Sequence, residues 1–311
     1  MTGSALLPSR HLWRPDELRT SRTWYKTASP TLIDELQQIV TWSAGNLDAI
    51  TPEAIRHFPT PAIDTLATWI RKQIGDEGYG VAKLQGLPTD PHYLAASTLI
   101  LGASMGTILD NYGKLYDVYD RGGCYKTEAI PISQTRHPTG FHTDSARRET
   151  IPDVISLTCV RDGIGGDTQL TSATHVYHRL VTEKPELVSS LHQSYVRAVV
   201  TPGTNPTPEA LAANNFPVFA LSPCGEALTF RYMRYWIEQG QHLAGAPIDR
   251  KTTEALDWLD ATLASPACFH EQHLHPGDLL WVANRDVAHA RTNYENRPGT
   301  TRLFYRMWLS L

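Results

Sequence analysis

The first third of the chain carries apolar residues at helical spacing. Segments 31–44 and 51–74 place leucine, isoleucine and tryptophan three or four positions apart, so each predicts an amphipathic helix. Gly78 follows the second segment as a plausible stop signal, and a third helix is predicted over 91–106. Residues 1–30 mix polar residues, prolines and a few aromatics without such a period, and we expect a loosely ordered lead-in there.

Short alternating segments bounded by glycine and proline dominate from about residue 116 onward. One strand is expected earlier in the chain, at 78–88. The candidate strands of the later part are 115–120, 129–135, 139–144, 154–160, 195–201, 217–222, 227–232, 268–274, 279–283 and 301–308. Tetrapeptides at 223–226 and 275–278 predict tight turns, and helical patterns return at 173–192 and 250–265.

Many short strands with Gly/Pro turns are typical of a β-sandwich or barrel, and helices at the front of the chain can pack against one face. We therefore expect a single α+β domain over 1–311. Its core, 78–311, is predicted to be a double-stranded β-helix (jelly roll) with flanking helices, and 1–77 to be a helical N-terminal lead-in.

Composition narrows the class of protein. The chain has 311 residues, of which 41% are hydrophobic and 19% charged, as in ordinary globular proteins. A net charge of −4 gives no sign of the basic surface that nucleic-acid-binding proteins carry, so no nucleic-acid partner is expected. The sequence has no apolar run long enough to span a membrane, so no membrane partner is expected. The four cysteines are too far apart for a zinc knuckle or a disulfide framework, which favours a reducing cytoplasm. No pattern indicates an oligomeric state.

The candidate chemistry begins at His142-Thr143-Asp144. Residues two apart in a strand project from the same face, so the imidazole and the carboxylate can reach one metal ion. His289 is the best distant candidate for a third ligand. Two histidines and one carboxylate leave three coordination positions open, the arrangement of non-haem Fe(II) oxygenases. Any one of these histidines, taken alone, is more simply a core or surface residue.

Two further segments fit the same chemistry. Gly165-Gly166-Asp167-Thr168 predicts a turn after a strand, and Thr168 offers a hydroxyl donor. Near the C-terminus, Arg302 and Arg306 share one face of an apolar, aromatic strand. A buried guanidinium needs a counter-charge, and a carboxylate fits its two parallel donors. A small diacid co-substrate would meet that need. Two arginines on an edge strand exposed to solvent are the simpler alternative.

Taken together and in this order, these motifs resemble the taurine dioxygenase/clavaminate synthase superfamily of Fe(II)- and 2-oxoglutarate-dependent dioxygenases. The resemblance runs over about 78–309 and implies iron ligands at His142, Asp144 and His289. It also implies that Thr168 and Arg302 bind the distal carboxylate of 2-oxoglutarate, and that Arg306 lies near its metal-chelating end or the substrate. Ala290 stands after His289 where many relatives have glycine.

The resemblance implies hydroxylation of an unactivated C–H bond by dioxygen, with release of succinate and CO2 from 2-oxoglutarate. Asp144 argues against halogenation, whereas desaturation, cyclisation and epoxidation stay open as alternatives. We expect a small polar metabolite as substrate, such as an amino acid or a natural-product intermediate. Gln134 and Arg147, together with Arg306, are candidate substrate contacts.

Two other interpretations compete with this one. The segment Cys268-x-His270-x-x-His273-x-His275 holds enough nitrogen and sulfur donors for a zinc-dependent hydrolase, but strand parity places 268 and 270 on one face and 273 and 275 on the other. A non-catalytic β-sandwich binding protein is the second alternative, although it has no need of an open iron site.

Overall fold

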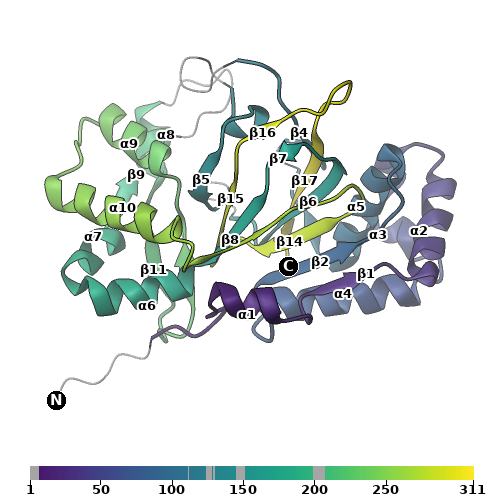
Figure 1. The fold of residues 1–311 in the computed structure, drawn as a ribbon, viewed down its shortest axis with the longest axis horizontal. Coiled ribbons are helices and arrows are strands. Elements are labelled where there is room, and N and C mark those ends of the chain that lie inside the picture. The colour runs from purple at the N-terminus through teal and green to yellow at the C-terminus, as the bar shows by residue number, and fades with distance from the viewer. Residues whose placement is uncertain (1–6, 111, 124–127, 129, 145–150, 199–206) are drawn as a thin grey trace.

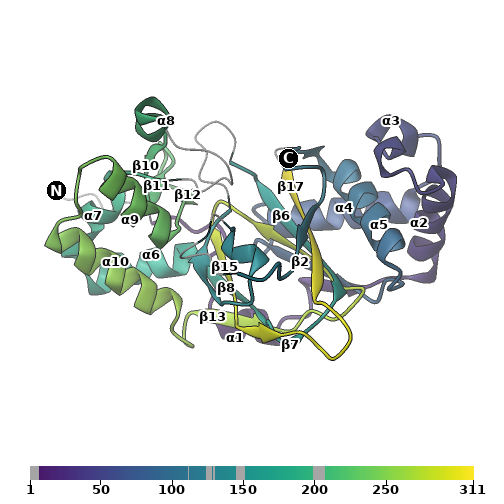
Figure 2. The same cartoon turned by 90° about the horizontal axis from the view of Figure 1, so that it is seen from above.

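Two β-sheets lie side by side in the middle of the molecule, and helices cover the outer side of each (Figure 1, Figure 2). The structure is a computed structural model that describes residues 7–110, 112–123, 128, 130–144, 151–198 and 207–311. Its mixed helix and sheet content confirms the predicted α+β class.

The larger sheet has seven strands, and its pairings are antiparallel except between the first two strands. In sheet order they are β1 (Tyr25–Thr27), β2 (Val81–Gln85), β14 (Leu279–Ala283), β6 (Val154–Arg161), β17 (Leu303–Ser310) and β3 (Thr107–Ile108), and β4 (Tyr116–Val118) also pairs with β17. Every residue of β14 is buried, because helices cover one face of this sheet and the second sheet lies against the other.

The smaller sheet has four antiparallel strands and supplies most of the candidate site. In order they are β13 (Phe269–Gln272), β8 (Thr168–Ser172), β15 (Val287–Arg291) and β5 (Thr139–His142). Three two-stranded ladders complete the described strands: β9 (Ser194–Val196) with β10 (Asn215–Pro217), β11 (Phe219–Leu221) with β12 (Leu228–Phe230), and β7 (Ile164–Gly165) with β16 (Tyr294–Glu295).

Among the N-terminal helices, α4 and α5 contact the strands of the larger sheet directly, whereas α1 contacts β13 of the smaller sheet. The N-terminal helices are α1 (Pro15–Thr20), α2 (Pro30–Ser43), α3 (Pro52–Ile55), α4 (Pro61–Ile74) and α5 (Pro91–Met105). Each begins with proline, which suits the first helical position because its missing N–H would be unpaired there. The predicted helix over 51–74 is wrong in this respect: it is two helices, and Pro61 starts the second.

The expected loose lead-in is also wrong for residues 7–30. Trp13, Leu18 and Trp24 are buried in the same hydrophobic core as the larger sheet. The indole N–H of Trp13 donates to the carbonyl of Tyr79, and β1 pairs with β2. Burying large apolar side chains of this kind contributes about 1.5–3 kcal/mol each. The segment is therefore held by side-chain packing, which the sequence did not reveal because these residues have no regular spacing.

The remaining helices cover the smaller sheet, with α6 and α10 in contact with its strands. They are α6 (Ala173–Glu183), α7 (Val188–His192), α8 (Pro208–Ala213), α9 (Arg234–Leu243) and α10 (Arg250–Leu263), and the short 3₁₀ turns are η1 (Leu47–Ala49), η2 (Ile132–Gln134) and η3 (Pro185–Leu187). The predicted helix over 173–192 is interrupted because Pro185 cannot continue it. The predicted strand over 129–135 is wrong where the chain is described, since 132–134 form η2 after Pro131. Every helix among the described residues is too short or too polar to cross a lipid bilayer.

Candidate metal and co-substrate site

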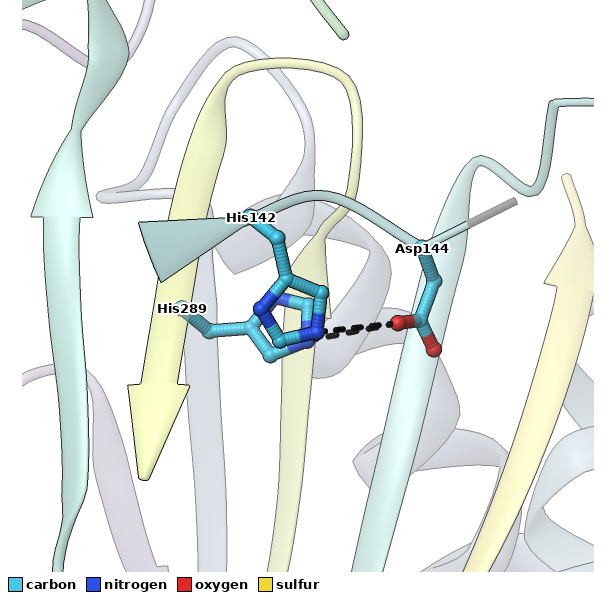
Figure 3. A group of neighbouring side chains, drawn as sticks. All are labelled: His142, Asp144 and His289. Atoms are coloured by element: carbon cyan, nitrogen blue, oxygen red, sulfur yellow. Dashed lines mark ion pairs between the residues drawn. The ribbon is translucent and has the colours of Figure 1, made fainter. Parts of the chain in front are cut away.

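Two strands of the smaller sheet bring two of the predicted ligands together. His142 ends β5 and His289 is the middle residue of β15, and the two residues pair directly across the antiparallel ladder. Directly paired residues present their side chains on one face of a sheet. The two imidazole rings accordingly lie 4.3 Å apart, centroid to centroid (Figure 3).

The third predicted ligand is held by its backbone. Asn284, fully buried just after β14, accepts a hydrogen bond from the backbone N–H of Asp144 at 2.8 Å. Its amide nitrogen donates to the carbonyls of Asp144 and Pro152 at 3.0 and 3.1 Å. One side chain therefore fixes the strand exit that carries the carboxylate.

The three side chains converge on a common point. Oδ1 of Asp144 lies 3.4 Å from Nε2 of His142 and 3.5 Å from Nε2 of His289 (Figure 3). Two ligands about 2.1 Å from one ion and at right angles to each other are about 3.0 Å apart, so a small closing movement is enough. All three side chains are buried, and this is one of two groups among the described residues with metal-binding spacing.

The protonation states suit a cation. Burial, followed by the neighbouring His142, lowers the pKa of His289 to about 4, and neither ring nitrogen of His289 has a hydrogen-bond partner among the described residues. Nδ1 of His142 donates to the carbonyl of Gly140 at 2.8 Å, which turns Nε2, the other ring nitrogen, toward Asp144 and the point where a metal would bind. Burial opposes ionisation of Asp144, but the Arg306 guanidinium overcomes it and holds the pKa of Asp144 well below its usual value.

A second charged group faces the same space. Arg302 is 3% exposed, and its guanidinium carbon lies 4.0 Å from the ring centre of Phe304 and 4.7 Å from that of Tyr294. Its Nη1 makes no hydrogen bond within the described chain, and burial lowers the pKa of this arginine. An unpaired buried guanidinium is costly, so this position suits an incoming carboxylate.

One cavity joins the two ends of the site. About 430 Å³ free of protein atoms lies in the cavity and at its opening to solvent, and the cavity is lined by His142, Thr168, His289, Arg302 and Arg306, among others. Its walls come from β5, β8 and β15 of one sheet and from β6 and β17 of the other, so it lies between the sheets. The two predicted histidine ligands and the predicted co-substrate residues thus line one space, and Asp144 lies directly behind the histidines.

Arg306 and an unpredicted residue both contact Asp144. Nη1 of Arg306 lies 2.9 Å from Oδ2 and 3.2 Å from Oδ1. The indole N–H of Trp308 donates to Oδ2 at 2.8 Å. A signal for Trp308 was present in the sequence, because 306 and 308 share one face of the same strand.

Arg291 is a second residue that sequence reasoning passed over. It is buried, and one terminal nitrogen donates to the carbonyl of Thr135 at 2.7 Å and also to that of His137. Its backbone N–H donates to the hydroxyl of Thr139 at 2.8 Å. Arg291 therefore holds the segment that leads into β5. Its pKa falls to about 10, first because of burial and then because of Arg302.

The predicted substrate contacts are less clearly placed. Gln134 is buried in η2, and with its amide oxygen turned toward Tyr116 it accepts from that hydroxyl at 2.9 Å and from Arg121. It is not among the residues that line the cavity, so a contact with substrate stays a prediction. Arg147 lies outside the described residues.

The histidine-rich segment does not gather into one site. Cys268 accepts from Arg179 at 3.0 Å, and His270 packs edge-on against Trp24, where burial lowers its pKa to about 4. His273 and His275 instead lie with Asp162. The four donors are thus divided between separate surroundings.

Comparison with known proteins agrees with this geometry. The family model described as "Taurine catabolism dioxygenase TauD, TfdA family" matches residues 46–308. FR-33289 synthase of Streptomyces rubellomurinus (strain ATCC 31215) is 26% identical over 251 residues, which cover 76% of this chain and 70% of that protein.

Solved structures share the fold. An asparagine oxygenase matches with a TM-score of 0.70 at 20% identity, covering 93% of both chains. The non-haem iron oxygenase OrfP in complex with Fe and alpha-ketoglutaric acid matches with a TM-score of 0.65 at 14% identity, covering 92% of this chain and 94% of that one. The family match favours an oxygenase over the zinc hydrolase and the binding module. The chain belongs to the TauD/TfdA family, and it is a non-haem iron dioxygenase that uses Fe(II) and 2-oxoglutarate, as its sequence motifs predicted.

Proposed function

We propose that His142, Asp144 and His289 hold the Fe(II) and that the cavity beside them is the active site. The observation that carries this proposal is the meeting of three buried ligand atoms, two of them from histidines that line a cavity into which Arg302 also faces; Nη1 of Arg302 has no hydrogen-bond partner among the described residues. The donor set fits ferrous iron, since two neutral imidazoles and one carboxylate on one side leave the cavity side free.

Thr168 and Arg302 are proposed to bind the distal carboxylate of 2-oxoglutarate. The guanidinium provides two parallel donors and the threonine hydroxyl a third. Phe304 and Tyr294 hold the arginine on its apolar sides, so that it needs little reorganisation when the co-substrate enters. Arg306, at the other part of the wall, is available to the chelating end of the co-substrate or to the substrate.

Bound iron and 2-oxoglutarate supply the oxidising chemistry: 2-oxoglutarate is decarboxylated to succinate and CO2, one oxygen atom of O2 enters succinate, and the other enters a C–H bond of the substrate as a hydroxyl group. The protein residues position the reactants and exclude water. The buried surroundings of His289 and Arg302 support the second role.

We further propose that the two sheets form a double-stranded β-helix within one domain over 1–311. The antiparallel pairing in the four-stranded sheet and the cavity between the sheets support this architecture. The free cysteines Cys159, Cys224 and Cys268 are consistent with the reducing cytoplasm proposed as its location.

The proposed substrate is a small polar metabolite, such as a free amino acid or a natural-product intermediate. Solved relatives of this fold include an asparagine oxygenase with 3-hydroxyasparagine and OrfP with (3S)-hydroxy-L-Arg, and FR-33289 synthase is a curated relative. Candidate contacts are Arg306, Gln134 and Arg147. Hydroxylation is the proposed outcome, with desaturation, cyclisation and epoxidation as alternatives at the same site.

The test is a screen for substrate-stimulated succinate release with Fe(II), 2-oxoglutarate and a library of amino acids and related metabolites. The expected hit gives one succinate per product, and the product is 16 mass units heavier than the substrate, as one added oxygen atom requires. A product lighter by two hydrogens indicates desaturation instead. If Fe(II) and 2-oxoglutarate give no charge-transfer band in anaerobic, folded protein, the assigned site is wrong.

A further inference from the structure

The two oxygens of Asp144 have different surroundings. Figure 3 shows both imidazole rings facing one of them, Oδ1, at 3.4 and 3.5 Å. The other, Oδ2, accepts from the indole N–H of Trp308 at 2.8 Å and from Nη1 of Arg306 at 2.9 Å. Arg306 also reaches Oδ1 at 3.2 Å, whereas Trp308 bonds Oδ2 alone.

The indole of Trp308 is held in place by its surroundings. It is 8% exposed, and its residue pairs with Ile155 across the ladder between β17 and β6. The rings of Tyr112 and Tyr116 each lie 5.7 Å from it, centroid to centroid. An indole N–H can only donate and stays neutral at every accessible pH, so its bond to the carboxylate is independent of protonation.

Arg306 and Trp308 differ in their access to ligands. Arg306 lines the cavity, and its Nε has no hydrogen-bond partner among the described residues, so co-substrate or substrate can engage it. Trp308 does not line the cavity. When a ligand draws Arg306 away, Trp308 is the donor that remains on Oδ2.

We propose that Trp308 is a positioning residue that keeps Asp144 bound to iron through Oδ1 only. This inference rests on the proposed iron site. A carboxylate can bind a metal through one oxygen or two. Three protein ligands leave three positions, of which 2-oxoglutarate takes two and dioxygen one. If Oδ2 also bound the ion, it would take the position that dioxygen needs. A hydrogen bond to Oδ2 directs that oxygen away from the metal.

The test compares Trp308→Phe with Trp281→Phe. Trp308→Phe keeps the ring and removes the N–H. Trp281 is a matched control, because it is fully buried in β14 and its indole nitrogen has no partner within the described chain. Mn(II) affinity, measured by calorimetry without dioxygen, gives a readout that does not depend on turnover. Outer ligands of this kind change metal affinity by about 10–100-fold.

We expect Trp308→Phe to change the affinity for Mn(II) about tenfold relative to Trp281→Phe, because the carboxylate of Asp144 loses the donor that fixes its orientation. In turnover, Trp308→Phe should release more succinate than hydroxylated product. The ratio of succinate to product should stay close to one in Trp281→Phe, and also in Trp308→His, which keeps a ring N–H. Equal Mn(II) affinity and equal coupling in W308F and W281F would overturn the proposal.

A measurement on the unsubstituted chain covers the case in which W308F does not fold. The indole N–H resonance of Trp308, assigned with Trp308→His, should remain protected from solvent exchange when Zn(II) fills the site. Loss of that protection on metal binding means that the hydrogen bond from Trp308 to Oδ2 breaks, and it refutes the proposed positioning role of Trp308. If the wild-type chain binds no divalent metal at all, the proposed iron site itself fails, which is a distinguishable result.

Discussion

Replacing Arg302 with methionine should have two effects of opposite sign. In the ligand-free protein, Arg302 is a buried cation for which no carboxylate partner occurs within the described chain. Methionine has a similar length and can fill the space beside Phe304 and Tyr294. The substitution removes a buried charge that has no carboxylate partner among the described residues, and burial of such a charge costs several kcal/mol. Imperfect packing of the new side chain offsets part of this gain. We therefore expect the free energy of unfolding to rise by about 1–2 kcal/mol.

The same change should weaken 2-oxoglutarate. A hydrogen bond to a charged group contributes about 1.5–3 kcal/mol, and 1.4 kcal/mol corresponds to a factor of ten in the dissociation constant. The dissociation constant for 2-oxoglutarate should therefore increase by about 10–150-fold. Urea titration measures the stability, and the charge-transfer band titrated with 2-oxoglutarate under nitrogen measures the affinity.

Arg56→Met is a suitable control for both measurements. Arg56 is exposed and pairs only with nearby groups in and around α3, so its replacement should change stability by less than about 0.5 kcal/mol and leave 2-oxoglutarate binding unchanged. If Arg302→Met lowers the stability by more than about 1 kcal/mol while the affinity for 2-oxoglutarate stays normal, Arg302 is a structural residue and the reasoning is wrong.

Three further predictions concern Asp144, Arg291 and His270. Asp144→Ala should abolish succinate release while the circular dichroism spectrum stays native, and full activity in that variant would contradict the ligand assignment. Arg291→Met removes the donor to the carbonyls of Thr135 and His137, so stability should drop by about 1–3 kcal/mol in urea titration, with a lower kcat; unchanged values would remove its positioning role. Burial lowers the pKa of His270 from 6.5 to about 4. As the pH falls, the histidine therefore takes up its proton in the unfolded chain before it does so in the folded chain. The stability contributed by the neutral imidazole of His270 is fully present above pH 6.5 and is lost as the pH falls toward 4. His270→Phe should flatten urea-derived stability over that range, by at most about 1.4 kcal/mol per pH unit, and an unaltered slope would contradict the shift.

The sequence predicted best those elements whose pattern is local. The helix expected at 91–106 is α5, and the strand expected at 279–283 is β14 with the same bounds. In contrast, β15, which carries His289, was missed as a strand: like β14 it is buried throughout, but its sequence Val-Ala-His-Ala-Arg lacks the run of large apolar residues that marks β14. Residues 7–30 were misjudged for a related reason, since the partners of Trp13 and Trp24 are distant in sequence or irregular in spacing; residues 1–6 lie outside the described residues.

The site shows the same division. His142 and Asp144 could be proposed because they stand two apart in a strand, and Thr168, His289 and Arg302 because their segments resemble family motifs in the same order. The role of Arg291 could not, because it depends on backbone carbonyls that any sequence possesses and that only the folded chain brings within reach. Predictions from residue type therefore find side chains that act on a ligand more readily than side chains that act on the backbone.

The amide of Asn284 has a consequence for engineering this scaffold. By bonding Asp144 and Pro152 at once, it ties together the two flanks of a short stretch of chain. That stretch can in principle be exchanged for one from another oxygenase, or lengthened, while the carboxylate keeps its place. A library of transplanted segments, with position 284 left untouched, would test whether this stretch can vary while the proposed metal ligand keeps its position.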